Sequence, residues 1–366
     1  MELFDRAAMR YFPLAERKNR LDVEKDFIDP AAVDSISVPA ELAEKAASVA
    51  AEILAARERN AAVIFAFGAH TIKNGLGLLL GEFIRRGWVT HLAANGAAVI
   101  HDWEFACQGR SGEDVRANAA EGKFGAWEET GLYINLALAL GAWQGLGYGE
   151  SIGAFITNNG LDIPDRVILK RAVESVSFPL WKRAAAADLL EVLESLKIEE
   201  GPIPVEHKFA RYSVQAAAYE ALIPFTSHPM FGHDIIYTHR ANRGAVIGRT
   251  AERDFLSYVR SVSRLEGGVY LSVGSAVMSP MIFEKALSMA RNTAGENSLR
   301  NCHLYVVDLQ EALWDWKSGE PPMDNPAYYL RFMKTFNRMG CPLEYFSADN
   351  RLFFAALYRA LLAAKK

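Results

Sequence analysis

The stretch AVIFAF, residues 62–67, followed by GAHTIKNG, residues 68–75, decides the fold. An unbroken apolar run of strand length is typical of a strand that is buried on both faces. The polar loop after it leads into a helical stretch over residues 76–86, and residues 89–94 (VTHLAA) form the next strand candidate. Strand, loop, helix and strand in this order predict a parallel βαβ unit.

The second half of the chain repeats this alternation. Strand candidates at residues 221–226, 269–273, 303–307 and 343–346 are each followed by a helical pattern, at 249–264, 281–291, 327–339 and 352–362. Alternating strands and helices indicate a parallel sheet covered on both faces. We therefore expect an α/β fold with a doubly wound, mostly parallel sheet of at least six strands.

The expected organisation is an N-terminal arm and one large domain. Residues 1–38 are irregular and contain several prolines, whereas residues 39–60 have the apolar spacing of an amphipathic helix. Residues 39–366 are expected to form a single α/β domain. A helical insert at about 110–210 would lie between its second and third strands.

Composition excludes several classes of protein. The 366 residues are 51% hydrophobic with a net charge of −4, so there is no basic footprint for nucleic acid. No apolar run approaches membrane-spanning length, and the N-terminus MELFDRAAMRYF lacks a signal-peptide core. Cys107, Cys302 and Cys341 are widely spaced, which indicates neither a disulfide framework nor a zinc knuckle. A cytoplasmic protein is expected.

The segments that follow the six strands carry the candidate site. They read GAHTIKNG, NGAAVIHD, SHPMFGHD, GSAVMSP, DLQE and SADN. The carboxyl ends of parallel strands share one edge of the sheet, and ligands bind there near the point where strand order reverses. Glycines, small residues, histidines and carboxylates from six loops should therefore meet at one place.

Two of these segments suggest a nucleotide. Gly68, Ala69, His70 and Thr71 could let a phosphate approach the backbone at a helix N-terminus, although the segment is neither GxGxxG nor Walker A and equally suits a plain βα turn. Asp308, or Asp349 with Asn350, could hold a ribose diol. The alternative for each aspartate is a helix N-cap.

Two further segments carry candidate acid–base or metal-binding groups. His101 titrates near neutrality and is a candidate general acid or base, while Asp102 would cap a helix and Glu104 would point along that helix into solvent. The segment SHPMFGHDIIYTH offers His228, His233, Asp234 and His239, but its spacing matches no metal motif. We assign no metal ligand.

Four places in the chain resemble the deoxyhypusine synthase superfamily, from about Ala61 to the C-terminus. AVIFAFGAHTIKNG stands where the family has a strand and a Ser-Asn dinucleotide loop, and THLAANGAAVIHD where it has a Thr-Ala-Gly-Gly turn. IPFTSHPMFGHDIIYTH resembles the family's Ile-Pro strand and Gly-Asp segment. VYLSVGSAV, YVVDLQE and YFSADNRLFFAALYRALL resemble its last three strands, with an Ala-Asp dipeptide that contacts the cofactor.

This resemblance implies a Rossmann-like fold that binds NAD and assembles as a homotetramer with sites between subunits. Asp234 would hold an amine substrate, Asp308 would be a ribose partner, and His101 stands where the family has a glutamate that grips substrate. The remaining residues carried over would line NAD: Ala69, His70, Asn95, Gly96, Leu309, Asp349 and Asn350.

The chain departs from the family at its catalytic lysine. Arg331 stands at that position, and a guanidinium stays protonated and cannot form an imine. Lys334, one helical turn away, is the candidate replacement. The expected function is therefore an NAD-dependent enzyme, transferase or oxidoreductase, with transient hydride transfer on a small amine (a polyamine, for example) or amino-acid-like substrate. The alternatives are true deoxyhypusine synthase activity and a non-catalytic scaffold.

Overall fold

The computed structural model describes residues 2–295 and 298–364 and is built around one sheet of six parallel strands. The sheet contains β2 (Val63–Phe67), β3 (His91–Ala94), β7 (Phe225–Ser227), β8 (Val269–Val273), β9 (His303–Asp308) and β10 (Leu343–Ser347). Their order across the sheet is β10-β9-β8-β2-β3-β7, and all five pairings are parallel. The expectation of a doubly wound α/β sheet with at least six parallel strands is confirmed.

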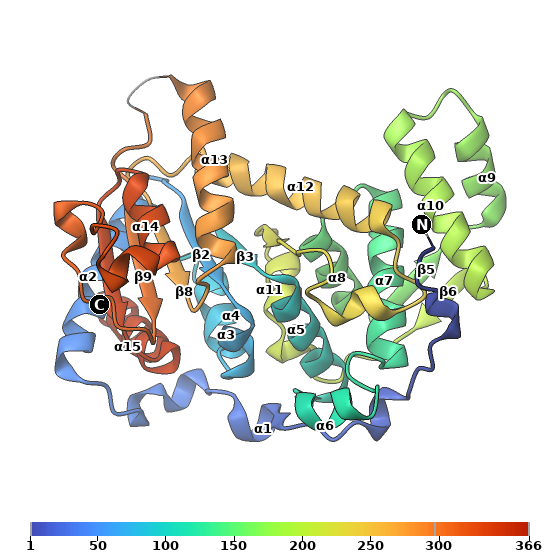
Figure 1. Cartoon of the computed structure of the whole chain (residues 1–366), viewed down its shortest axis with the longest axis horizontal. Helices are drawn as coiled ribbons and strands as arrows, with labels where there is room; N and C mark the ends of the chain where they lie inside the picture. The colour runs from blue at the N-terminus through green and yellow to red at the C-terminus, as the bar shows by residue number, and fades with distance from the viewer. Residues whose placement is uncertain (1, 296–297, 365–366) are drawn as a thin grey trace.

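Helices cover both faces of the sheet (Figure 1). Along β2, Val63, Phe65 and Phe67 belong to one buried cluster while Ile64 and Ala66 belong to another, so every strand position contributes to a core. The first face is covered by α2 (Ala40–Glu58), α4 (Gly77–Arg85), α5 (Gly96–Gln108) and α15 (Asn350–Ala363), and the second by α12 (Gly244–Val262), α13 (Met278–Ala294) and α14 (Arg331–Arg338). Burial on both faces explains the continuous apolar runs in the sequence.

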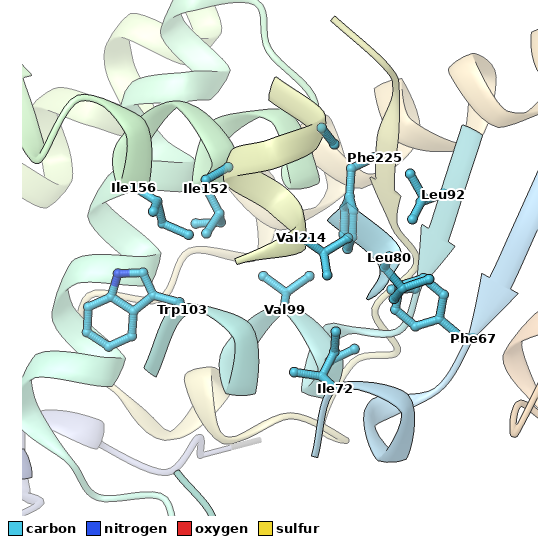
Figure 2. Packing of buried hydrophobic residues seen from close by; sticks show 14 of the residues in the cluster. Phe67, Ile72, Leu80, Leu92, Val99, Trp103, Ile152, Ile156, Val214 and Phe225 are labelled. Carbon is cyan, nitrogen blue, oxygen red and sulfur yellow. The ribbon is translucent and has the colours of Figure 1, made fainter. Parts of the chain in front are cut away.

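A largely helical region lies between β3 and β7 in the sequence. After α5 it contains α6 (Val115–Ala120), α7 (Glu128–Gln144), α8 (Tyr148–Thr157), α9 (Arg166–Glu174), α10 (Leu180–Leu196) and α11 (Val214–Glu220). It also holds an antiparallel pair that the sequence did not suggest, β5 (Gly160–Ile163) with β6 (Gly201–Pro204). Figure 2 shows this region joined to the sheet in one core: Val99 and Val214 lie between Ile152 on the helical side and Phe67 on the sheet side.

Over residues 2–38, the N-terminal segment contains only short elements and lies along the rest of the chain (Figure 1). These are 3-10 turns at Arg6–Ala8, Leu14–Glu16 and Pro30–Ser35, the strand β1 (Leu21–Asp22) and the helix α1 (Val23–Asp26). β1 pairs antiparallel with β4 (Arg110–Ser111), beyond the end of α5. Arg17 also reaches the interior, where its guanidinium binds the carboxylate of Glu104.

Two expected elements differ from those observed. The strand expected at 221–226 is only Phe225–Ser227, because Leu222 has a positive φ of 55° and Pro224 has no N–H to donate to a ladder. The helix expected at 327–339 is a 3-10 turn at Pro326–Tyr329 followed by α14, which begins at Arg331. Among the described residues, no helix combines the length and apolar character needed to cross a membrane.

Candidate functional site

The carboxyl edge of the sheet has the geometry that favours ligand binding. Counted along the chain, the strands lie in the order 3-2-1-4-5-6, so the direction of winding reverses between β2 and β8. The connections after these two strands diverge from each other and leave a crevice, which is where dinucleotides bind in sheets of this order. Gly68 and Gly274 follow directly on β2 and β8.

These two glycines allow the strand ends to approach closely. A Cβ atom on Gly68 would lie 2.5 Å from the carbonyl oxygen of Gly274, which is backbone and cannot swing away. Gly274 has a φ of +56°, a conformation that other residues rarely adopt. Gly68 is also the N-cap of the short helix α3 (Ala69–Lys73), so the first backbone N–H groups of this helix, which have no partner in a preceding helical turn, lie next to the crevice.

A cavity of about 220 Å³ opens on the β10 side of Gly274, and we call it the β10-side cavity. Its lining contains five of the residues expected to bind the cofactor. The complete lining is His70, Asn74, Gly274, Val307, Asp308, Leu309, Ala348, Asp349 and Asn350.

The two aspartates of this cavity each keep one oxygen unbonded. Asp308 Oδ1 accepts from the backbone of Gln310 at 3.1 Å, and Asp349 Oδ1 accepts from Arg351 at 2.7 Å as the N-cap of α15. The other carboxylate oxygens make no hydrogen bond among the described residues. Capping and ligand binding are therefore compatible here, and either carboxylate can still accept from a hydroxyl group.

A second cavity of about 200 Å³ lies on the other side of Gly274, towards β7, and we call it the β7-side cavity. It brings together the expected residues Gly68, Asn95, Gly96 and Asp234. The complete lining is Gly68, Asn95, Gly96, His228, Met230, His233, Asp234, Gly274, Ser275, Ala276, Val277 and Met278. The two cavities share Gly274, so one elongated ligand could occupy both.

Asp234 stands out at this edge as a buried carboxyl group whose side chain has no hydrogen bond among the described residues. Its side chain is buried, and Oδ2 has no hydrogen-bond partner among the described residues. It lies against the first residue of α5: a Cβ atom on Gly96 would be 2.1 Å from Oδ2. Burial raises the pKa of Asp234 to about 7, so protonated and ionised forms are both accessible near neutrality. Such a group suits acid–base work or the binding of a cation.

A hydrogen-bonded chain leads from this cavity to the surface of α12. His228 Nε2 lies 2.9 Å from Thr226 Oγ1, which lies 2.8 Å from His91 Nε2, and His91 Nδ1 lies 2.8 Å from Ser261 Oγ. Burial lowers the pKa of both histidines to about 3, so both rings are neutral. Each neutral ring carries one N–H donor and one acceptor nitrogen, so a proton taken up at Nδ1 of His228 could be passed along the chain if every bond in it reversed.

The structure does not bring His101 into either cavity. The helix α5 begins at Gly96, which places His101 in its second turn, with Nδ1 2.7 Å from Ser111 Oγ. Burial lowers the pKa of His101 to about 4, against the opposing effect of Glu104. His101 was expected at the carboxyl edge of the sheet because the sequence does not show at which residue α5 begins.

Asp102 and Glu104, the two carboxylates near His101 in sequence, both make hydrogen bonds inside the protein, and the expectation that Glu104 faces solvent is wrong. Glu104 does not point into solvent: it is 1% exposed and binds Arg17, Ser111 and Thr130. Asp102 does cap a helix, but that helix is α11. The carboxylate of Asp102 accepts hydrogen bonds from the backbone N–H groups of Val214 and Gln215, at the start of α11.

The remaining candidates line neither cavity. Ala69 and Thr71 lie on α3 beside the crevice, and the hydroxyl of Thr71 is buried without a partner. Lys334 lies on α14 with its ammonium 3.6 Å from the ring centre of Tyr328, and Arg331 is exposed at the start of that helix. No group of three or more potential metal ligands occurs in the described part of the chain.

Some lining residues were not singled out from the sequence. Ser275, Ala276, Val277 and Met278 come from the segment after β8, and Asn74 comes from the end of α3. His228 was noted only as a possible metal ligand. All of them lie in segments that follow a strand, and the sequence does show this. No motif in these segments, however, distinguishes a residue that lines a cavity from an ordinary turn residue.

Comparisons with known proteins show no family for this chain. No family model and no curated protein matches the sequence, so none names deoxyhypusine synthase. Among solved structures, unliganded AgrE matches 90% of this chain at 15% identity and a TM-score of 0.44, and AgrE is also known as a ternary complex with ornithine and NAD⁺. ArgZ, an arginine dihydrolase from the cyanobacterial ornithine–ammonia cycle, matches 89% of this chain at 14% identity and a TM-score of 0.42.

The chain spans about a third of the length of these proteins, 34% in each case. An LOR/SDH protein of Methanococcus maripaludis S2 is matched over more of its length, with 98% of this chain and 75% of that protein covered at 13% identity and a TM-score of 0.42. Similarity at this level leaves the function to be inferred from the residues of this chain.

Proposed function

We propose that this chain is an NAD-dependent enzyme that oxidises a small amine or amino-acid-like substrate by transient hydride transfer. The observation that carries the proposal is the pair of cavities on either side of Gly274, one with two half-free aspartates and the other with the unpartnered carboxyl of Asp234. Both lie at the edge and at the reversal point where a sheet of this order binds dinucleotides.

The residues present fit NAD. In the β10-side cavity, Asp308 and Asp349 would accept from ribose hydroxyls, while His70, Leu309 and Asn350 would complete the adenosine end. Gly68 with Gly274 would let the pyrophosphate pass close to the backbone, next to the N-termini of α3 and α5 that begin at Ala69 and Gly96. Thr71, with an unpartnered hydroxyl, and Asn95 belong to the same two turns.

The β7-side cavity would hold the reacting end. Bound NAD supplies a hydride acceptor, and this chain supplies the groups that position the substrate and handle its proton. Asp234, in its ionised form, would bind the ammonium group of the substrate. His228 Nδ1 makes no hydrogen bond among the described residues, and its ring is the inner end of the chain to Ser261, so it is placed to accept a proton released there.

No observation favours deoxyhypusine synthase activity. No lysine lines either cavity, and Lys334 of the covering helix α14 contacts the ring of Tyr328 in the preceding 3-10 turn. His101 is likewise not part of the proposed reaction, because its ring is directed to Ser111. The proposed organisation is one NAD-binding domain, residues 39–366, with an arm at 1–38. The proposed setting is the cytoplasm, in a homotetramer.

The first test is NAD binding. The purified protein would be denatured and analysed for released NAD, and the emptied protein titrated with NAD⁺ by calorimetry. Asp308→Asn and Asp349→Asn should each weaken binding about tenfold or more, because charge-assisted bonds to ribose contribute about 1.5–3 kcal/mol. Asparagine still caps a helix, so the second variant should fold normally.

The control is Asp165→Asn, which changes the same residue type at the N-cap of α9, outside both cavities. It should leave NAD affinity unchanged. A wild-type protein that neither contains nor binds NAD would refute the proposal and favour the scaffold alternative. If NAD binds, amines and amino acids with a terminal cationic group, ornithine and arginine included, form the first substrate screen.

A further inference from the structure

Two of the three cysteines meet at the opposite end of the sheet from the proposed site. Cys302 immediately precedes β9 and Cys341 lies two residues before β10, and these strands are paired with Leu304 opposite Leu343. Their Sγ atoms are 2.7 Å apart, close enough for a hydrogen bond between thiol and thiolate. The two cysteines are distant in sequence but adjacent in the fold, and both are free thiols in the structure.

The surroundings of the pair make the two sulfurs unequal. Arg291 of α13 places Nη2 3.7 Å from Cys341 Sγ, and the carbonyl of Leu299 lies within 3.9 Å of both sulfurs. The hydrogen bond from Cys302 and the positive charge of Arg291 lower the pKa of Cys341, whereas Cys302 keeps its proton. Cys341 is 8% exposed and Cys302 is fully buried.

This asymmetry matches the roles of attacking and resolving cysteines. The thiolate is the nucleophile in sulfur chemistry, and susceptibility to oxidation follows thiolate character and exposure. Cys341 has the greater share of both, while Cys302 is held in contact with it and shielded from reagents. Cys107 is separate from this pair, and burial raises the pKa of its thiol to about 11.

We propose that Cys302 and Cys341 form a reversible disulfide when the protein meets a hydroperoxide. The thiolate of Cys341 attacks the peroxide O–O bond, which gives the sulfenic acid of Cys341 and releases the other oxygen as hydroxide or an alkoxide. The thiol of Cys302 then attacks that sulfur and displaces water, forming the S–S bond. The two thiols are oxidised by two electrons and the hydroperoxide is reduced by two. A small thiol reductant reverses the change.

The disulfide would fasten the edge strand β10 to β9. It would close a loop from Cys302 to Cys341, which contains β9 with Asp308 and the helix α14. Closing this loop would reduce the conformational entropy of the unfolded chain. The oxidised protein should therefore melt at a higher temperature than the reduced protein, by roughly 3–8 °C. This inference is independent of the proposed NAD chemistry.

The test counts thiols on the intact protein. Reduced protein, unfolded and alkylated, should carry three labels, one on each of its cysteines. After hydrogen peroxide treatment and removal of excess reagent, only Cys107 should be labelled. The intact monomer should have lost the mass of two hydrogen atoms, and dithiothreitol should restore the three labels.

Two variants separate this outcome from general oxidation. In Cys302→Ser, Cys341 should stop at the sulfenic acid and be captured by dimedone, with no rise in Tm after peroxide treatment. Cys107→Ser, the matched control, should lose both of its remaining labels as wild type does. Three labels on the peroxide-treated wild type, or a disulfide that joins two chains through Cys107, would overturn the proposal.

Discussion

At the residue scale, Asp234 is a carboxyl group that the folded protein keeps without a partner. Burying an ionised carboxylate without hydrogen bonds is costly, and here the cost appears as a pKa raised to about 7 from its ordinary value of 3.8. Groups of this kind persist where function requires them and the rest of the fold supplies the stability. Replacing this carboxyl should therefore stabilise the protein and impair the proposed site.

Asp234→Asn should gain stability over wild type as pH rises. Between the unfolded and folded pKa values the folded state retains a proton that the unfolded state has released, so wild type loses stability as pH rises to about 7. Asparagine removes this loss. The variant's advantage in free energy of unfolding should grow by about 2–3 kcal/mol between pH 5 and pH 8. Urea denaturation at both pH values measures it, and an advantage that stays constant would contradict the assignment.

Asp102→Asn serves as the contrast, because that buried carboxylate is fully hydrogen-bonded. It accepts from Ser213 Oγ, from Gln215 Nε2 and from two backbone groups at the start of α11. An amide nitrogen there would face donors, so the variant should lose about 2–4 kcal/mol already at pH 5. If Asp234→Asn stabilises the protein while Asp102→Asn destabilises it, the hydrogen-bond partners of a buried aspartate, and not its burial alone, determine the effect of the substitution on stability.

At the element scale, the strands were predictable because their chemistry is unambiguous. β8 matches its expected bounds at Val269–Val273, since five apolar or small residues in a row suit a strand buried on both faces. β5 and β6 were missed because GLDI and GPIP contain glycine and proline, which weaken any strand signal. Much of the candidate site followed from the strand ends, but His101 did not, since its position depends on where α5 begins.

Gly68→Ala tests the contact between the ends of β2 and β8. The added Cβ would lie 2.5 Å from the carbonyl oxygen of Gly274, so the two strand ends must separate. We expect a loss of about 1–3 kcal/mol in stability and weaker NAD binding, measured by thermal denaturation and calorimetry.

Gly248→Ala is the matched control for this variant. Gly248 lies on α12, where an added Cβ meets nothing within 4 Å. Alanine there should stabilise the protein by about 0.5–1 kcal/mol and leave NAD binding unchanged. Equal effects of the two substitutions would mean that the close approach at Gly68 is not required.

At the scale of the whole molecule, the N-terminal segment is fastened by a buried ion pair. Both Arg17 and Glu104 are almost fully buried, and the guanidinium donates two parallel hydrogen bonds to the carboxylate. Burial alone would raise the pKa of Glu104, but the charge and hydrogen bonds of Arg17 bring it below its usual value. The segment therefore contributes to the stability of the body it lies against.

Arg17→Met should destabilise the protein by about 3–5 kcal/mol, because it leaves Glu104 buried without its counter-charge. The double variant Arg17→Met/Glu104→Gln should recover most of this loss, since the amide can still bond to Ser111 and Thr130. Chemical denaturation of the three proteins forms the test. If both variants were equally unstable, packing of the segment rather than charge would be responsible.

The long helical region between β3 and β7 has a consequence for how the chain folds. Leu92 pairs with Phe225, so this edge of the sheet forms only when the chain between them, from α5 to α11, closes into a loop. Closing so long a loop is entropically costly before the pairing rewards it. β2 and β3 are joined by a much shorter connection, so they can associate early, and β7 should dock in a late, slow phase of refolding.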